Sequence, residues 1–295
     1  MRLFEILMLV TILPVLLWPL SPWRRPRWVD FLPATAVLFL IIQLLVEGYR
    51  WQMLPAYLLV VALFLLTLPR LRSPSPREKK GSGWVIAGSL LGLLLWLVAL
   101  ALPVLLPVPQ LPDVTGSFAI GTQTFHLTDE SRDEIYTDDP GDKREIMMQV
   151  WYPAEADAEG ETAVYLDDLD VVGAVLAERL DLPAFLLDHV NLVDVGAQND
   201  VPVLAADAPY PVLVFSHGLR GFRGQNTTMA RELVSHGFVV VTIDHTYGNV
   251  ISVFPDGRVA FYTPEVLSGD GQPPRTSNTL VNVWADDIGF ALDQL

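Results

Sequence analysis

The sequence predicts an α/β domain that follows four membrane-spanning helices. Four apolar stretches lie before Gln110, and the composition changes from basic to strongly acidic after it. Within the acidic part, residues 211–247 have the pattern of a buried strand, a glycine-rich loop, a helix and a second buried strand. We therefore expect a membrane region over residues 1–110 and a separate domain over residues 111–295.

The four apolar stretches each approach the ~20 residues that cross ~30 Å of hydrocarbon as a helix. Interfacial aromatic residues such as Trp23, Trp51 and Trp84 lie at their ends. The second and third stretches are short, so a re-entrant hairpin is an alternative to two full spans. No stretch carries an ionisable residue at its centre, which favours an anchor over a transport path. The predicted spans are residues 3–20, 31–46, 51–68 and 84–108.

The loops between these stretches differ in charge. The first loop carries three arginines within residues 24–27, and the third carries five basic residues within 70–80, while the loop between them is nearly neutral. The positive-inside rule places both basic loops in the cytoplasm. The sequence therefore predicts a multi-pass protein of the cell membrane, with everything after Val108 on the extracytoplasmic side. The first span lacks a small-residue cleavage site, which favours an uncleaved helix over a signal peptide.

The charge balance separates the two parts and excludes some functions. Residues 1–110 carry 10 Lys+Arg and 4 Asp+Glu, and residues 111–295 carry 9 and 30, so the net charges are +6 and −21. A domain this acidic repels the phosphates of a nucleic acid, so nucleic acid is not an expected partner. The chain has no cysteine, which excludes disulfides, thiol catalysis and cysteine-ligated metals.

Two strands and an irregular segment precede the central unit of the domain. Residues 118–127 and 146–152 have strand patterns, and an acidic loop, residues 129–143, joins them. Residues 155–208 are less regular. We expect this segment to be an insertion in the domain or a cap over it.

The central unit, residues 211–247, predicts a right-handed parallel crossover. A short apolar run, residues 212–215, ends at Ser216, and its continuity is typical of a strand buried on both faces. Glycines in the following loop permit tight turns and close approach to a ligand. A helix ends at Gly237, and a second buried strand ends at Asp244. Because ligands bind at the carboxyl ends of parallel strands, we expect the binding site there.

The last part of the chain predicts a hairpin and a helix. Residues 254–262 contain an Asp-Gly turn between two short apolar runs. Apolar residues then recur at three- or four-residue spacing from Leu280 to Leu295, with Ser277 or Asn278 as the N-cap. No strand pattern follows this helix. We therefore expect a fragment of a longer protein, with an exposed apolar edge on one of the central strands.

A glycine-rich sequence follows the first central strand. Residues 216–221, Ser-His-Gly-Leu-Arg-Gly, have the form His-Gly-x-x-Gly at a strand end. In acyl transfer the tetrahedral intermediate carries a negative charge on oxygen, and backbone N–H donors must approach that oxygen closely. A loop in this position supplies one such donor in α/β-hydrolases. The sequence therefore predicts one side of an oxyanion hole.

Eight segments of the domain carry a resemblance to a known family. They are residues 121–124, 128–132, Arg144, 150–154, 210–219, 222–223, 236–245 and 286–295. On these residues the domain resembles the platelet-activating factor acetylhydrolase family, in its plasma and type II forms and their bacterial relatives. The resemblance covers residues 116–295 and not the four apolar stretches.

The resemblance implies an α/β-hydrolase that cleaves short or oxidised acyl chains from phospholipids. It implies a Ser-Asp-His triad and neither a metal nor another cofactor. A phospholipid or a short-chain ester is then the expected substrate, and the membrane is the expected partner.

The resemblance gives one residue a catalytic role. The backbone N–H of Leu219 matches the first oxyanion donor of the family. No Gly-x-Ser-x-Gly occurs in a suitable position, so the nucleophile and the rest of the triad are expected beyond Leu295. The candidates for lining the pocket are His217, Gly218, Asp244 and His245.

A triad within the loop is a competing interpretation, built from Ser216, Asp244 and one of the two histidines. We disfavour it because Ser216 lacks the strand-to-helix elbow that exposes a nucleophile. We expect the histidines and Asp244 to order the loop instead. Arg220 and Arg223 are candidates for attracting a phosphate head group, and pairing with carboxylates is the favoured alternative in so acidic a domain.

Two classes of function fit these observations. The first is a membrane-anchored serine esterase of the acetylhydrolase type, with a carboxylesterase or dienelactone-hydrolase-like enzyme on soluble esters as its close alternative. The second is a non-catalytic membrane protein that uses a degenerate hydrolase domain for binding. The missing triad motivates this second class.

Overall fold

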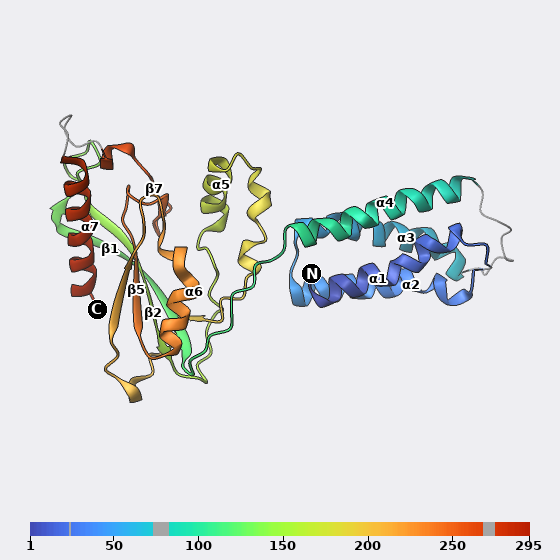
Figure 1. The fold of residues 1–295 in the computed structure, drawn as a ribbon, viewed down its shortest axis with the longest axis horizontal. Helices are drawn as coiled ribbons and strands as arrows, with labels where there is room; N and C mark the ends of the chain where they lie inside the picture. The colour runs from blue at the N-terminus through green and yellow to red at the C-terminus, as the bar shows by residue number, and fades with distance from the viewer. Residues whose placement is uncertain (24, 73–82, 268–274) are drawn as a thin grey trace. The chain divides into compact units, whose positions relative to one another are not determined.

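A computed structural model describes residues 1–23, 25–72, 83–267 and 275–295. The chain divides into two compact units, Met1–Pro109 and Gln110–Leu295 (Figure 1). The described part of the first unit is helical, and the second unit combines a mixed sheet with helices. Each unit has its own buried core.

The first unit is built from four long helices. They are α1 (Leu3–Leu17), α2 (Leu32–Ile42), α3 (Leu54–Arg72) and α4 (Gly83–Leu105). Short helical turns extend them: η1 (Trp18–Leu20), η2 (Arg27–Asp30), η3 (Gln43–Glu47) and η4 (Trp51–Met53). With these turns, four stretches of 18 to 23 residues have the length and composition to cross a membrane: Leu3–Leu20, Arg27–Glu47, Trp51–Leu71 and Gly83–Leu105. The second and third stretches each have 21 residues, which is enough for a full span.

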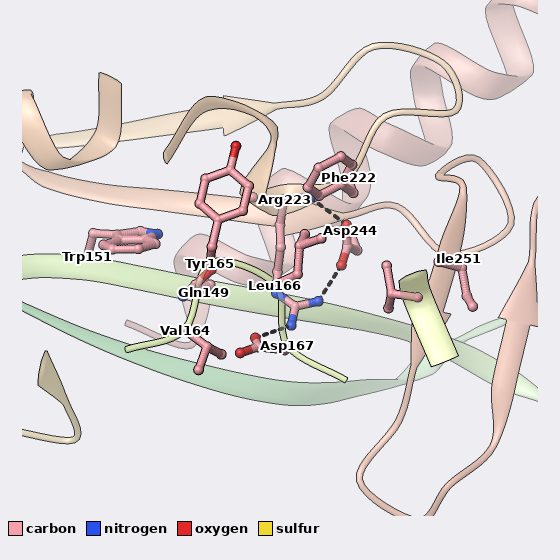
Figure 2. A pocket seen from close by; sticks show the side chains of 12 residues that line it. Gln149, Trp151, Val164, Tyr165, Leu166, Asp167, Phe222, Arg223, Asp244 and Ile251 are labelled. Carbon is pink, nitrogen blue, oxygen red and sulfur yellow. Dashed lines mark hydrogen bonds and ion pairs between the residues drawn. The ribbon is translucent and has the colours of Figure 1, made fainter. Parts of the chain in front are cut away.

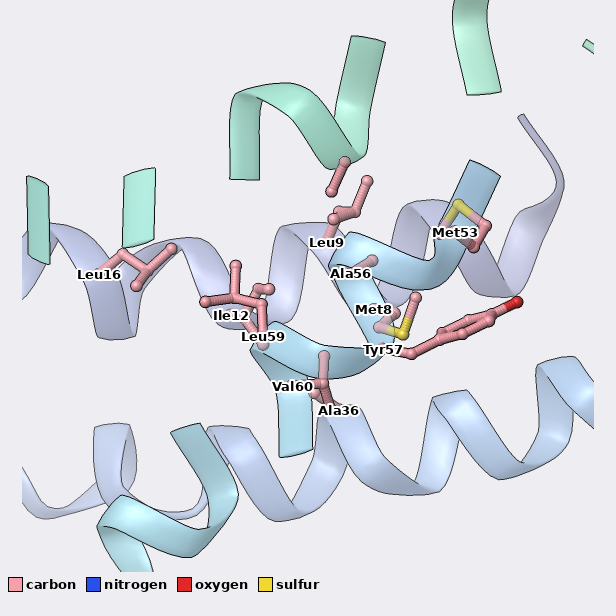
Figure 3. Close-up of a cluster of buried hydrophobic side chains, with 11 residues drawn as sticks. Met8, Leu9, Ile12, Leu16, Ala36, Met53, Ala56, Tyr57, Leu59 and Val60 are labelled. Carbon is pink, nitrogen blue, oxygen red and sulfur yellow. The ribbon is translucent and has the colours of Figure 1, made fainter. Parts of the chain in front are cut away.

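Apolar side chains from all four helices form the core of this unit. Figure 3 shows Met8 and Ile12 of α1 beside Val60 of α3 and Ala36 of α2. Ala99 of α4 belongs to the same buried cluster. Small residues in this cluster let the helices approach closely, which favours packing between apolar helices.

Helix α4 uses only one of its two spaced glycines for packing. A Cβ on Gly92 would lie 2.6 Å from the side chain of Leu16, so the missing side chain lets α4 approach α1. A Cβ on Gly88 would meet nothing within 4 Å. Of this pair, Gly92 therefore provides the close contact between helices.

A buried cluster of charged side chains, here called the bundle cluster, joins the helix ends. It consists of Arg2, Glu5, Glu47 and Arg50. The Nε of Arg2 donates to Glu5 Oε1 at 3.0 Å, and the Nε of Arg50 lies 3.4 Å from the same oxygen. Arg50 also donates to the carbonyl oxygen of Pro103 in α4 at 3.2 Å. The cluster lies at the ends of the helices, so it agrees with the absence of ionisable residues at their centres.

A five-stranded mixed sheet organises the second unit, in the order β3-β1-β2-β5-β4. The pair β4–β5 is parallel, as the crossover pattern predicts, and β1–β2 and β2–β5 are antiparallel. The short β3 pairs in parallel with β1. The strands are β1 (Ala119–Asp133), β2 (Lys143–Ala154), β3 (Gln198–Asn199), β4 (Val212–Ser216) and β5 (Val239–Asp244).

The first two strands are longer than the sequence pattern predicts. The expected acidic loop over residues 129–143 is wrong at both ends, because the ladder continues through Asp129↔Arg144 and, after a bulge, to Asp133↔Lys143. The Nζ of Lys143 lies 2.6 Å from Asp133 Oδ1. Cross-strand pairs of opposite charge stabilise a ladder, so charged residues continue these strands where the apolar alternation has ended.

Helices cover the two faces of the sheet (Figure 1). On one face, α6 (Thr227–Ser235) packs through Ala230 and Val234 onto Trp151 and Val240. On the other, α7 (Arg275–Asp293) packs through Ala291 onto β2 and β5. The helix begins before Ser277, so the predicted N-cap is wrong. Alternate residues of β5 point to opposite helices, as the two-residue period of a strand requires.

Strand β4 lies at the edge of the sheet, as expected for one of the central strands, and among the described strands it has only β5 as a neighbour. Val212 and Leu213 are therefore 46% and 40% exposed. The expectation that this strand is buried on both faces is wrong, because an edge strand lacks the second neighbour that would cover its flank. A further strand can pair with this free edge.

The remaining elements are a hairpin and several short helices. A hairpin of β6 (Ile251–Val253) and β7 (Val259–Phe261) turns at Gly257, whose φ is +85°. The irregular segment, residues 155–208, contains α5 and single helical turns. These are α5 (Leu169–Arg179), η5 (Ala184–Leu187), η6 (Val190–Leu192) and η7 (Ala205–Asp207), with η8 (Arg223–Asn226) and η9 (Pro264–Leu267) later in the chain.

Candidate active site

The backbone N–H groups of the loop that follows β4 differ in whether they are bonded within the described residues. The N–H of Gly221 donates to the carbonyl of Gly218 at 2.7 Å, and that of Arg220 donates to the carbonyl of Gly248 at 2.9 Å. Arg220 adopts a left-handed conformation with φ +61°, which is uncommon for a residue with a side chain. Among the described residues, no acceptor is bonded to the N–H of Leu219, and Leu219 is 42% exposed. This amide is free to bind a ligand oxygen.

His217 is buried beneath this loop and holds it by two hydrogen bonds. Its Nε2 lies 3.2 Å from the backbone N–H of His245, which can only donate, so Nε2 accepts. Its Nδ1 lies 2.7 Å from the carbonyl oxygen of Gly218 and therefore carries the proton and donates. Burial lowers the pKa of His217, against the opposing effects of Asp244 and the Gly218 carbonyl. The His217 ring is therefore neutral and links the residue after β5 to the loop through these two hydrogen bonds.

The His245 ring connects the exposed end of β4 to a buried carboxylate. Its Nε2 lies 2.9 Å from the hydroxyl of Ser216, and its Nδ1 lies 2.9 Å from Oδ2 of Asp287 in α7. His245 and Asp287 are fully buried, whereas Ser216 is exposed. The three side chains form a continuous hydrogen-bonded line from the protein interior to the candidate site.

Trp284 of α7 fixes the orientation of both histidine rings. It stacks on the His245 ring with centroids 4.5 Å apart and an interplanar angle of 7°. It meets the His217 ring edge-on at 5.2 Å. The close approach of Gly248 makes room for this indole, because a Cβ there would lie 2.8 Å from it. The rings therefore have no free space in which to turn.

Two arginines hold Asp287 as a carboxylate. Arg144 donates from Nε and Nη2 to the two carboxylate oxygens at 3.0 and 2.7 Å, and Arg132 lies 3.0 Å from Oδ1. Burial alone would raise the pKa of Asp287, but hydrogen bonds from His245 and Arg144 and the charge of Arg144 hold that pKa well below its usual range. Glu134 also pairs with the Arg144 guanidinium at 2.9 Å, so two carboxylates and two arginines meet in this cluster.

Asp244 faces the other side of the sheet and takes part in a separate ion pair. It accepts from the backbone N–H of Arg223 at 2.6 Å and also pairs with the guanidinium of Arg223. The same guanidinium lies 2.6 Å from Asp167 of the irregular segment. Burial lowers the pKa of Arg223, but the charges and hydrogen bonds of Asp244 and Asp167 outweigh it and raise the pKa.

A small cleft adjoins this ion pair, between the irregular segment and the core. Figure 2 shows the Arg223 guanidinium between Asp244 and Asp167, with apolar side chains around it. Both carboxylates already neutralise Arg223, so the cleft offers an apolar wall rather than a free cation. The side chains along that wall include Trp151, Val164, Leu166, Phe222 and Ile251.

Arg220 differs from Arg223 in its surroundings. Its guanidinium lies 4.3 Å from the centroid of the Tyr262 ring, and Arg220 is exposed. No carboxylate pairs with it among the described residues. Of the two arginines that the sequence proposed for a phosphate, only Arg220 keeps its charge available, one residue after Leu219.

The structure brings together some of the predicted site residues and separates one. His217, Gly218, Leu219 and His245 share the carboxyl ends of β4 and β5, whereas Asp244 points to the cleft beside Arg223. A triad with Asp244 as its acid is excluded in this geometry, because His245 bonds to Asp287 instead.

The sequence interpretation missed the roles of Trp284, Asp287 and Arg144. Trp284 stood in the apolar spacing of the last helix, and Asp287 lies on that same face, seven residues after Leu280. An acidic residue on the buried face of a helix requires a partner. That pattern was the available signal, but it could not identify Arg144, which is 143 positions away.

Comparisons with known proteins identify the family to which the chain is similar. The family model of platelet-activating factor acetylhydrolase, isoform II, matches residues 106–253. The platelet-activating factor acetylhydrolase of Cavia porcellus is 30% identical over 103 residues, which cover 34% of this chain and 23% of that protein. The enzyme of that name from Canis lupus familiaris is 27% identical over 149 residues, covering 49% of this chain and 30% of that protein.

A solved structure shares the fold. The ferulic acid esterase from Streptomyces cinnamoneus superposes with a TM-score of 0.51 and 28% sequence identity, covering 64% of this chain and 49% of that one. It supports an α/β-hydrolase-like fold with a mixed sheet for the second unit. The chain spans less than a third of the length of the curated relatives it matches.

Proposed function

Because the chain belongs to the platelet-activating factor acetylhydrolase family, we propose that it is part of a membrane-anchored serine esterase acting on short acyl esters of phospholipids. The unused N–H of Leu219 is the observation that carries this proposal. It lies where charge develops on the carbonyl oxygen during acyl transfer, and a fixed donor there stabilises the transition state. The serine, aspartate and histidine of the triad are supplied by residues outside these 295.

The free edge of β4 supports this division of roles. A further strand paired with β4 places its own carboxyl end beside Leu219, where a serine can attack an ester whose oxygen is bound by this amide. The apolar cleft beside Phe222 and Trp151 then borders the acyl or leaving group. In this scheme Leu219 binds the oxyanion, while His217 and Gly218 shape the loop.

Assay of the full-length gene product tests the proposal. We expect it to hydrolyse p-nitrophenyl acetate, and a serine-reactive phosphonate to abolish that activity and label a single serine after residue 295. Activity that resists the phosphonate would contradict a serine mechanism. Absence of hydrolysis would favour a domain that only binds its ligand.

The charge of Arg220 supports the phospholipid over a soluble ester. An exposed guanidinium next to the oxyanion donor can bind the phosphate of a phospholipid. We expect Arg220→Gln to raise KM for an acetylated phospholipid about fivefold and to leave hydrolysis of p-nitrophenyl acetate nearly unchanged. Arg179→Gln, an exposed arginine at the end of α5, is the matched control.

The likeness to a ferulic acid esterase favours one alternative, an enzyme for soluble esters. In that case Arg220→Gln would change the two substrates equally, and soluble esters would be the better substrates in the unmodified enzyme. The comparison of substrates therefore separates the two proposals without a further variant.

We also propose that the four apolar helices anchor the enzyme in the cell membrane, with the second unit on the extracytoplasmic side. These 295 residues contain no cysteine, so single cysteines can be introduced into them without other changes. A membrane-impermeant maleimide is expected to label Ser117→Cys in intact cells and Ser21→Cys only after lysis. The opposite pattern would invert the topology.

A further inference from the structure

Asp287, His245 and Ser216 form a relay that the proposed reaction does not use. The distances are 2.9 Å from Asp287 to Nδ1 of His245 and 2.9 Å from Nε2 to the Ser216 hydroxyl. Two of the three side chains are fully buried. Burying polar groups is unfavourable unless they are fully hydrogen-bonded. This buried arrangement therefore needs a structural or functional explanation.

The directions of the hydrogen bonds follow from the groups at the buried end. Asp287 is a carboxylate that accepts from Arg144, so it also accepts from His245, and Nδ1 carries a proton. In the neutral ring Nε2 is then an acceptor for the hydroxyl proton of Ser216. The ionised carboxylate thereby fixes the tautomer of the ring, and the ring fixes the serine hydroxyl.

His245 contacts the oxyanion loop at two consecutive residues. Its ring binds Ser216, and its backbone N–H donates to the ring of His217, which in turn donates to Gly218. Leu219 follows immediately. Hydrogen bonds that begin at the buried carboxylate of Asp287 in α7 therefore fix the direction of the Leu219 N–H.

We infer that Asp287 is a positioning residue for the oxyanion donor: acting through His245, it fixes Ser216 and His217 and so aims the N–H of Leu219. The catalytic consequence rests on the proposed function. The hydrogen-bond directions do not, and they can be measured in this chain whether or not it takes part in ester hydrolysis.

The relay has the atoms of a Ser-His-Asp triad, so a nucleophilic Ser216 is the competing interpretation. Ser216 is the last residue of β4 and has extended, paired backbone, with Ser216 opposite Ile243 of β5. A hydrolase nucleophile lies instead on a sharp turn between a strand and a helix. The geometry therefore assigns Ser216 to the support of the loop.

Nitrogen-15 spectra of the histidines test the relay in the 295-residue chain. We expect His217 and His245 each to carry a proton on Nδ1 and to accept at Nε2, and Asp287→Asn to give His245 a mixture of both tautomers. Ser117→Ala, at an exposed serine whose side chain forms no hydrogen bond within the described structure, is expected to change neither ring. A proton fixed on Nε2 of His245 in the unmodified chain would overturn the inference.

Kinetics of the full-length gene product test the catalytic consequence. We expect Ser216→Ala to lower kcat about tenfold, less than the ~10²–10³-fold loss of an entire oxyanion donor, with KM for p-nitrophenyl acetate within about twofold. Binding of a trifluoromethyl ketone, which forms a tetrahedral oxyanion, is expected to weaken by the same factor. Ser216→Thr, which keeps the hydroxyl, is expected to restore most of the rate, and Ser117→Ala to change none of these values.

The outcomes separate the two proposals. If the unmodified enzyme hydrolyses esters and Ser216→Ala has full kcat and inhibitor affinity, the positioning role is wrong and the proposed function stands. If the unmodified enzyme does not hydrolyse esters, the proposed function fails and the spectra decide the relay. Phosphonate attached to Ser216 would show a nucleophile there and overturn the positioning role.

Discussion

Both units bury a cluster of charged side chains, and the two clusters end differently. The bundle cluster of the first unit closes on backbone carbonyls. The cluster of the second unit, here called the relay cluster, consists of Arg144, Asp287, His245 and Ser216 and ends at an exposed hydroxyl. We infer that the group at which a buried hydrogen-bonded network ends, rather than the burial of the network, shows whether its role is structural or functional.

The bundle cluster satisfies groups that the helix ends leave unpaired. The guanidinium of Arg2 donates to the carbonyls of Glu47 and Gly48, and Arg50 donates to that of Pro103. The last carbonyls of a helix have no partner within the helix, so these bonds cap helix ends. Each of these hydrogen bonds ends at a backbone carbonyl, so the bundle cluster is consistent with a role in holding the helices together.

The relay cluster instead stops beside an amide that has no partner in the described structure. Ser216 is exposed, and the N–H of Leu219 lies three residues further along the chain. A hydrogen-bonded network that ends at an exposed group can transmit a change at a buried residue to a ligand bound at that end. Four predictions test this contrast.

Breaking the relay cluster at Arg144 is expected to have the largest effect. Arg144→Ala leaves Glu134 buried without its salt-bridge partner and leaves Asp287 with Arg132 alone, and removing one partner of a buried ion pair typically costs about 3–5 kcal/mol. Urea unfolding of the second unit measures the loss. It can be followed by the fluorescence of Trp151 and Trp284 in a variant whose other tryptophans are replaced by phenylalanine.

Arg258→Ala is the matched control for that substitution. Arg258 also pairs with two carboxylates, Glu145 and Asp256, but its side chain is 55% exposed. Exposed pairs contribute about 0–1 kcal/mol. Equal losses in the two variants would mean that the buried arrangement has no special importance.

The bundle cluster is expected to tolerate replacement as a whole. Glu5→Gln alone leaves Arg50 buried with a weakened partner, at a cost of about 2 kcal/mol, because Arg50 still donates to Pro103. Glu5→Leu combined with Arg50→Met removes both charges and is expected to recover most of that loss in thermal unfolding in detergent. An equally unstable double variant would show that these charges do more than hold helix ends.

The same experiment in the relay cluster sharpens the contrast. Arg144→Met combined with Asp287→Leu is expected to recover stability relative to Arg144→Ala. It is not expected to recover the kcat of the full-length gene product, because His245 loses the acceptor that fixes its tautomer. Full activity in this double variant would remove the functional distinction between the two clusters.

The sequence predicted the parts of the fold that repeat over a short range. The parallel crossover follows from residues 211–247, where two apolar runs flank a helix with one apolar face, and the structure confirms it. The ends of β1 and β2 were harder to predict from the sequence. Asp133 and Lys143 extend β1 and β2 through a pairing between charges, which apolar alternation does not record.

The candidate site was predictable only in its local half. His217, Gly218 and Leu219 are neighbours in a loop, and glycine spacing identifies that loop. Asp287 reaches the site from a different element, and its contact with His245 spans 42 positions. Such a contact depends on which face of α7 meets the sheet, and a single sequence does not specify the register of that packing.

A pH-dependent loss of stability is expected from His217. Burial lowers its folded pKa below the value of about 6.5 in the unfolded chain. Between these two values the unfolded state binds a proton that the folded state does not, so stability falls as pH falls. The slope is at most about 1.4 kcal/mol per pH unit, and above pH ~6.5 the effect is absent.

His217→Gln is expected to remove this dependence from the urea unfolding of the second unit. His236→Gln, at a 50% exposed side chain just after the end of α6, is the matched control. The lowered pKa of Asp287 acts in a separate window, because its stabilisation is complete above the unfolded value of ~3.9 and is lost only as pH falls below it. An unchanged slope near pH 6 in His217→Gln would assign the proton to another group.

The smallest expected effect comes from Gly92→Ala. This substitution tests how much the stability of the first unit depends on close helix packing rather than on the bundle cluster. Gly92→Ala would place a Cβ 2.6 Å from the Leu16 side chain, which can move at its flexible end, so we expect a loss of at most about 1 kcal/mol. Gly88→Ala meets no neighbour within 4 Å and is expected to be neutral or slightly stabilising through helix propensity. Thermal unfolding in detergent measures both. If Gly92→Ala exceeds Glu5→Gln in its effect, close apolar packing rather than the bundle cluster is the main constraint on the helices, and the charges are secondary to it.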